Sequence, residues 1–245
     1  MNFISQHYIK ILIILFLIEF VVLAISPHDR KDWALENFLV LIFVTALLTS
    51  YRNFPLSKIS YGLIFVFLCL HEVGAHYTYA EVPYDVFLQS VFGFSLNEAM
   101  GWQRNHFDRL VHFSYGLLLA YPMREMYCRI ANARGFWGYF FPLDLVMAAS
   151  MMFELFEWGA AEMFGGDLGV AYLGTQGDIW DAHKDMLLAS TGAFLAMCIT
   201  MAINIKIQPD FANEWRESLK VKRKEPLGEV EIRRLIIENN RSNAE

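Results

Sequence analysis

Six long apolar segments, separated by polar stretches, most constrain what this chain can fold into. They cover residues 8–25, 34–50, 59–77, 107–123, 142–164 and 183–204. At about 1.5 Å per residue, helices of such length suit a hydrocarbon core of roughly 30 Å. With 56% hydrophobic residues and a mean hydropathy of +0.32, the chain is too apolar for one soluble domain. We therefore predict an all-α, polytopic membrane bundle with about six transmembrane helices over residues 1–205, followed by a charged cytoplasmic tail over residues 206–245.

The distribution of lysine and arginine predicts how the segments are oriented. If the N-terminus is cytoplasmic, the inner loops and the tail hold most of the 20 basic residues. Positively charged flanks favour the cytoplasmic side of a membrane. The outer face then holds only Arg30, Lys31, Arg104, Arg109 and Lys184. Both termini are therefore predicted to be cytoplasmic.

Net charge and cysteine usage exclude several functions. The net charge is −6 and the sequence has no basic face, so we expect no nucleic-acid partner. The three cysteines, Cys69, Cys128 and Cys198, have no paired spacing, which predicts neither a disulfide framework nor a zinc or redox CxxC site. Membrane lipids are the expected surroundings of the chain, and the sequence leaves its oligomeric state undetermined.

Ionisable residues are costly inside a membrane and mark functional sites there, and here they gather at one end of the last four segments. They are His71, Glu72 and His76 in the third, Arg104, His106, Asp108, Arg109 and His112 at the start of the fourth, Glu154 and Glu157 in the fifth, and Asp178, Asp181 and Asp185 at the entrance to the sixth. Consecutive segments run in opposite directions, so all four groups fall in the outward-facing half at similar depth. We predict that they form one site.

Seven of these residues are carboxylates, which cannot all be ionised together in a low-dielectric pocket without cations. Three ways to balance their negative charge are open: a divalent metal, ion pairs, or protons shared between carboxyl groups. Imidazole and carboxylate ligands suit zinc, iron or manganese. The first-choice ligands are His76, His112, Glu154 and Asp181. In the ion-pair alternative, Asp108 pairs with Arg104 or Arg109.

The leading functional hypothesis is a metal-assisted hydrolase or transferase that acts on a lipid or another envelope molecule. In this hypothesis the metal activates a water molecule, Glu157 or Asp185 serves as general base, and Arg109 belongs to the catalytic group. His71, Glu72, Arg104, His106, Asp108 and Asp178 are further candidates for the site. Two alternatives stay open: an ion-coupled transporter or permease, and a non-catalytic envelope or assembly factor with a structural charge network.

Four strings in the sequence carry a family resemblance: HEVGAHYTY, RNHFDRLVHFSYG, FELFEW and LGTQGDIWDAHKDMLLASTGA. In this order they resemble the uncharacterised YjdF-type family of bacterial inner-membrane proteins, over roughly residues 5–205. A more distant likeness is to VanZ-like proteins, through Asp108, Arg109 and His112, then Glu154 or Glu157, then Asp181 with Asp185. The resemblance implies a multi-pass protein of the bacterial inner membrane. It implies no known reaction or cofactor.

Overall fold

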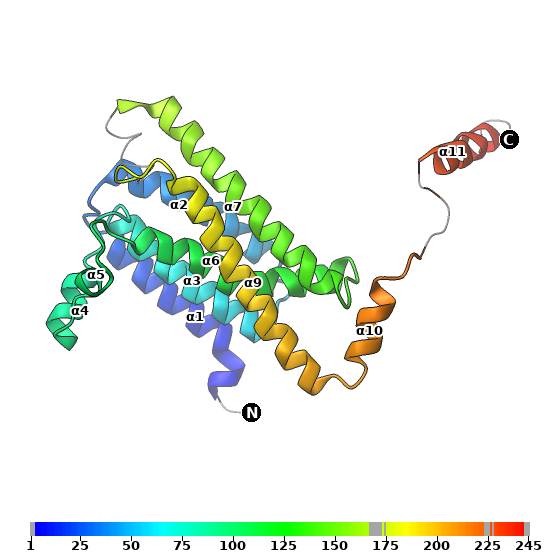
Figure 1. Cartoon of the computed structure of the whole chain (residues 1–245), viewed down its shortest axis with the longest axis horizontal. Helices are drawn as coiled ribbons and strands as arrows, with labels where there is room; N and C mark the ends of the chain where they lie inside the picture. Colours follow the sequence, from blue (N-terminus) through cyan, green and yellow to red (C-terminus); the bar gives the residue numbers. More distant parts are fainter. Residues whose placement is uncertain (1–2, 167–172, 174, 223–225, 227, 243–245) are drawn as a thin grey trace.

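The computed structural model describes residues 3–166, 173, 175–222, 226 and 228–242, and the regular secondary structure in these residues is helical. The helices are α1 (Phe3–Leu23), α2 (Arg30–Ser50), α3 (Lys58–His76), α4 (Tyr84–Phe92), α5 (Leu96–Met100), α6 (Phe107–Ile130), α7 (Trp137–Phe164), α9 (Asp181–Ile207), α10 (Phe211–Ser218) and α11 (Glu229–Ser242). Figure 1 shows their arrangement, with the long helices forming one bundle.

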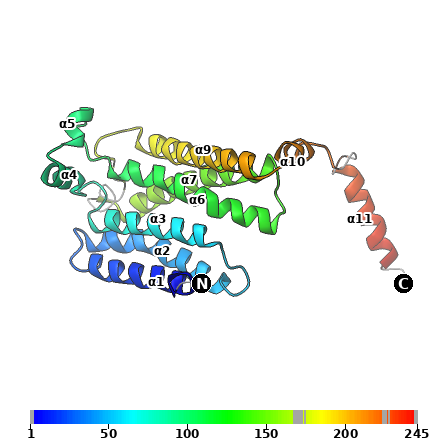
Figure 2. The ribbon, with the colours of Figure 1, turned by 90° about the horizontal axis from the view of Figure 1, so that it is seen from below.

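The long helices pack as two layers. In one layer α1 and α2 pack against α3, and in the other α7 and α9 pack against α6. The contact between α3 and α6 joins the two layers, which are seen edge-on in Figure 2. Consecutive long helices run in opposite directions, so α3 ends where α6 begins, and α7 ends where α9 begins. We call this end of the bundle, from which α4 and α5 project in Figure 1, the site end.

The closest contact in the bundle is between α6 and α9, where small residues let the two backbones meet. A Cβ atom added to Gly116 would lie 1.8 Å from the carbonyl oxygen of Ala189, and one added to Gly192 would lie 2.2 Å from that of Phe113. Ala193 beside them is fully buried. Small residues favour helix association in membranes because they allow close packing. This contact sets the spacing between the two helices that carry most of the site.

The helices confirm the predicted all-helical membrane bundle. Among the described residues, four helices are long and apolar enough to cross a membrane: α2, α3, α9, and α7 over Trp137–Met163. The helices extend beyond the predicted segments; α6, for example, continues through Pro122 to Ile130. The number of spans, including α1 and α6, and the cytoplasmic location of both ends remain predictions.

The segment after residue 205 begins with structure that belongs to the bundle. Helix α9 continues to Ile207, and α10 then folds back against the start of α7. The amide of Gly135 donates to Glu214 Oε1 at 2.9 Å, and the indole of Trp137 donates to the carbonyl of Ser218 at 2.8 Å. The predicted tail therefore starts with a helix anchored to the bundle, whereas α11 lies apart from it in Figure 1.

Candidate functional site

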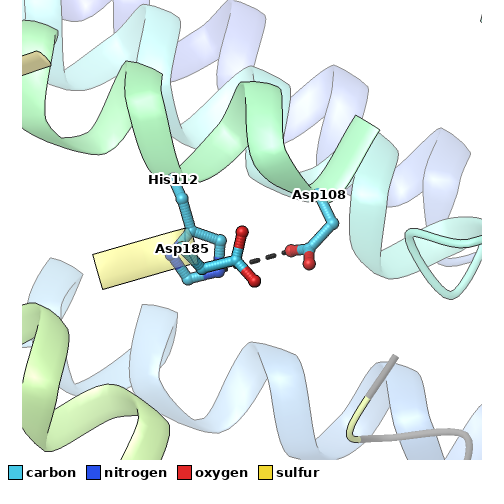
Figure 3. A group of neighbouring side chains, drawn as sticks. All are labelled: Asp108, His112 and Asp185. Carbon is cyan, nitrogen blue, oxygen red and sulfur yellow. Dashed lines mark ion pairs between the residues drawn. The ribbon is translucent and has the colours of Figure 1, made fainter. Parts of the chain in front are cut away.

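Asp108, His112 and Asp185 form the centre of the site. Asp108 and His112 are one turn apart on α6 and therefore share a face, and Asp185 comes from the facing first turns of α9 (Figure 3). His112 Nε2 lies 3.3 Å from Asp108 Oδ1. One ligand atom from each of the three residues lies within 4.8 Å of the other two, an arrangement that could hold a metal ion. The close contact between α6 and α9 brings these groups together.

Two glutamates of α7 complete this acidic cluster. Glu154 Oε1 lies 3.8 Å from His112 Nδ1, on the opposite side of the imidazole from Asp108. Glu157, one turn further along α7, lines a cavity with Asp108 and His112. Both glutamates also line a second cavity, which Asp185 borders. The structure thus brings together five of the predicted site residues, which we call the acidic cluster: Asp108, His112, Glu154, Glu157 and Asp185.

Several buried oxygens in this region make no hydrogen bond to a described residue. They include Asp185 Oδ1 and Glu154 Oε1, and Asp185 is only 2% exposed. A buried polar atom without a partner is costly, so such atoms indicate a bound ion, water or proton. In the acidic cluster four carboxyl groups surround a single imidazole. The charge balance therefore calls for a cation or for bound protons.

A second group at the site end consists of ion pairs, which we call the arginine lattice: Arg104, Arg109, Asp178, Asp181 and Lys184. Arg104 donates to Asp181 at 2.6 Å, and Arg109 donates to Asp178 at 2.5 Å. Asp178 also accepts from Lys184. Hydrogen bonds from the Lys184 ammonium and the Trp180 amide lower the pKa of Asp178. This acid is therefore ionised at neutral pH.

Two predicted site residues make contacts that differ from the expected ones. Asp181, predicted as a metal ligand, is held by both arginines, because Arg109 Nη2 also lies 3.3 Å from its carboxylate. Asp108, which the ion-pair alternative assigned to Arg104 or Arg109, instead faces His112. The arginines extend from the start of α6 toward the first turn of α9, so they meet the acids there. Arg109 is thus paired with acids of the arginine lattice and borders neither cavity of the acidic cluster.

His106 lies beside the arginine lattice. Its ring stacks on Trp102 at a centroid distance of 4.1 Å, and Nδ1 lies 3.2 Å from Arg109 Nη1. Burial, and then the charges of Arg109 and Arg104, lower the pKa of His106. The imidazole is therefore neutral at neutral pH, and its contacts are with Trp102 and Arg109 rather than with the acidic cluster.

The three candidates on α3 make their closest contacts outside the acidic cluster. His76 Nδ1 bonds to the carbonyl of Leu23 at 2.7 Å, so its ring ties α3 to the end of α1. Glu72 is fully buried and interacts with Glu19 of α1. His71 Nδ1 bonds to the Tyr79 hydroxyl at 2.6 Å, and His71 lines the same cavity as Asp108 and His112. The face of α3 that carries Glu72 and His76 turns toward α1 rather than α6.

Helix α2 contributes two buried acids that are not among the predicted site residues. Glu36 is 3% exposed and lines the cavity beside Asp108, and Asp32, one turn earlier, is equally buried. Ser150 of α7 lines the same cavity with an unpartnered hydroxyl. The spacing of four between Asp32 and Glu36 repeats that of Asp108 and His112. Two acids four residues apart at the start of an apolar segment are a signal in the sequence that indicates these positions.

A polytopic helical bundle with a buried acidic cluster at one end defines an integral membrane protein with an internal polar site. The chain belongs to the family described as "Predicted membrane protein (DUF2238)", which matches residues 8–206. It is 41% identical over 170 residues to the inner membrane protein YjdF of Escherichia coli (strain K12), a match covering 69% of this chain and 77% of that protein. No solved structure matches the chain. The predicted YjdF-type family is confirmed, and the chain is a multi-pass inner-membrane protein. The distant likeness to VanZ-like proteins remains a prediction.

Proposed function

We propose that this chain is a metal-dependent hydrolase or transferase that acts on a lipid or another envelope molecule. The observation that supports this most is the clustering of Asp108, His112 and Asp185 with ligand atoms within 4.8 Å of one another. The unpartnered, buried Asp185 Oδ1 points to a bound cation as the missing partner. Two carboxylates and an imidazole suit zinc, iron or manganese.

Glu154 has a role in this proposal that differs from the predicted one. A histidine that binds a metal through one ring nitrogen usually donates its other N–H to a carboxylate or a carbonyl, which orients the ring. Glu154 faces His112 Nδ1 while Asp108 faces Nε2. We assign Nε2 to the metal and Glu154 to orienting the imidazole. Glu154 is then a positioning residue rather than a ligand.

Glu157 is placed to serve as general base. It borders both cavities that meet at the acidic cluster, so it has access to water and to a substrate. A bound metal lowers the pKa of its water to about 7, which makes a nucleophile available at neutral pH. Glu157 would take the proton of the attacking water and return it to the leaving group. Hydrolysis and transfer differ here only in whether water or an acceptor hydroxyl attacks.

The first prediction concerns metal content. Detergent-purified wild-type protein should carry about one divalent ion per chain by elemental mass spectrometry, with affinity reduced roughly 100-fold or more in Asp185→Asn and His112→Ala, because each removes a ligand. Glu154→Gln should weaken binding by about 10- to 100-fold, as expected of an orienting carboxylate. Metal titration of the stripped proteins measures these differences.

Matched controls exist for each of these substitutions. Asp144→Asn and Glu162→Gln change exposed acids of α7, and His76→Ala removes a histidine outside the acidic cluster. All three should retain the wild-type metal content. Wild-type protein without stoichiometric metal would contradict the proposal and leave the transporter and assembly-factor alternatives. Equal loss of metal in the controls would contradict the assignment of the ligands.

A further inference from the structure

Two cavities meet at the acidic cluster. The first has a volume of about 380 Å³ and lies between α7 and α9, where Glu154, Asp181 and Asp185 line it together with apolar residues. The second has a volume of about 280 Å³ and lies among α2, α3, α6 and α7. Asp108 and Glu157 line both. The acidic cluster therefore stands at the junction of the two chambers.

The second chamber becomes apolar away from the acidic cluster. Its polar lining consists of Asp108, His112, Glu157, Glu36, His71, Tyr79 and Ser150. The rest of its walls are formed by aromatic and aliphatic residues, among them Val40, Phe43, Leu119 and Met123. Phe43, Leu119 and Met123 also line a third cavity of about 320 Å³, which continues along α6 to Ile130. The shared residues make the two chambers neighbours, and together they form an apolar channel that starts at the acidic cluster.

The length of this apolar channel matches a membrane lipid. From Asp108 to Met123 along α6 is a rise of about 22 Å at 1.5 Å per residue. One leaflet of a hydrocarbon core of about 30 Å is roughly 15 Å thick. A lipid with its head at the acidic cluster thus has room for a complete acyl chain in the channel.

Helix α2 has few contacts with the layer that contains α6 and α7. Helix α2 packs against α3 but makes no comparable contact with α6 or α7, although residues of all four helices line the channel. Figure 2 shows α2 in one layer and α7 in the other. On α2 itself Val40 is buried against the channel, whereas the next residue, Leu41, is 65% exposed to the surroundings. This weakly packed boundary between the layers is the side from which a lipid chain would enter.

We propose that the acyl chain of a membrane phospholipid occupies the apolar channel, with its headgroup at the acidic cluster. The inference deepens the proposed function, on which it rests, by naming the substrate class as a phospholipid that enters sideways. Apolar walls favour a hydrocarbon chain, and the first chamber, which is lined by carboxyl groups on the far side of Asp108 and Glu157, offers space for a headgroup and for water. A bound divalent metal would balance a phosphate charge.

Photocrosslinking tests the inference directly. The protein is placed in nanodiscs of phosphatidylethanolamine and phosphatidylglycerol in which one acyl chain carries a diazirine, irradiated, and mapped by peptide mass spectrometry. We expect adducts on Phe43 and Met123 besides those on exposed residues. Val40→Trp should reduce the Phe43 and Met123 adducts by roughly fivefold or more because the indole fills the channel. Leu41→Trp, the adjacent lipid-facing control, should leave them unchanged.

A second channel substitution and a second lipid probe complete the experiment. Leu119→Trp, from the opposite wall, should repeat the loss if Val40→Trp fails to give monodisperse protein. Adducts confined to exposed residues, or channel adducts that both substitutions leave intact, would overturn the inference. Stronger channel labelling by a diazirine fatty acid than by the phospholipid would overturn the choice of a phospholipid.

The same assay on metal-free Asp185→Asn protein separates this inference from the proposed function. The channel walls do not include Asp185, so adducts should persist without metal. Channel adducts in protein that never binds metal would support the lipid site and contradict the metal centre. Stoichiometric metal without channel adducts would support the metal centre and contradict the lipid site.

Discussion

Gly192→Ala should destabilise the protein by about 1–3 kcal/mol, because the added methyl group has no space between α6 and α9. Its Cβ would lie 2.2 Å from the backbone oxygen of Phe113, which cannot rotate away as a flexible side chain could. The helices must therefore separate, which also moves Asp185 away from Asp108 and His112. Gly116→Ala, on the facing helix, should have the same effect through Ala189. Thermal unfolding of monodisperse protein in detergent measures the loss.

The matched control for this prediction is Gly159→Ala in α7. A Cβ atom at Gly159 would meet no atom within 4 Å, and the backbone there is helical. Alanine is a better helix former than glycine by about 1 kcal/mol, so this change should be neutral or stabilising. Opposite signs for Gly192→Ala and Gly159→Ala are expected. Equal unfolding temperatures for both variants would show that the close contact between α6 and α9 is not required.

Arg104→Gln should be the most damaging change in the arginine lattice. The Arg104 and Asp181 side chains are 13% and 4% exposed, and removal of one partner leaves a buried carboxylate with less compensation. Breaking a buried ion pair in this way costs about 3–5 kcal/mol. Arg109, at 3.3 Å from Asp181, should recover only part of this loss. Folded yield and unfolding temperature in detergent measure the effect.

A double-mutant cycle distinguishes pairing from general disturbance. Asp181→Asn together with Arg104→Gln should be more stable than Arg104→Gln alone, because the double variant carries no uncompensated buried carboxylate. Arg234→Gln, in an exposed pair with Glu231 on α11, should have no measurable effect on stability. Additive losses from Arg104→Gln and Asp181→Asn would show that the two side chains act separately.

The convergence of the ionisable groups could be predicted from the sequence because it depends only on alternating helix directions. Segments that reverse at each turn bring the end of α3, the start of α6, the end of α7 and the start of α9 to one level. The pairing of Asp108 with His112 on one face also follows from their spacing of four. The alternation of helix directions and the spacing of residues within one helix can both be read directly from the sequence.

The identity of the groups that touch could not be predicted, because it depends on how each helix is rotated about its axis. Glu72 and His76 share a face, as their spacing indicates, but packing turns that face toward α1. The partners of Arg104 and Arg109 depend on the backbone before α6 and before α9, which has no sequence periodicity. Glu36 is the single ionisable residue of its predicted segment, residues 34–50, and its place beside Asp108 depends on how α2 packs in the bundle.

The most direct test of the metal centre is an experimental structure with anomalous scattering data collected above the absorption edge of the metal found by elemental analysis. We expect one strong peak bound by Asp108, His112 and Asp185 at about 2.0–2.2 Å, with Glu154 hydrogen-bonded to the other nitrogen of the imidazole. An anomalous peak elsewhere, or metal-loaded protein in which Asp108 and Asp185 bond only to His112 or to each other, would contradict the account.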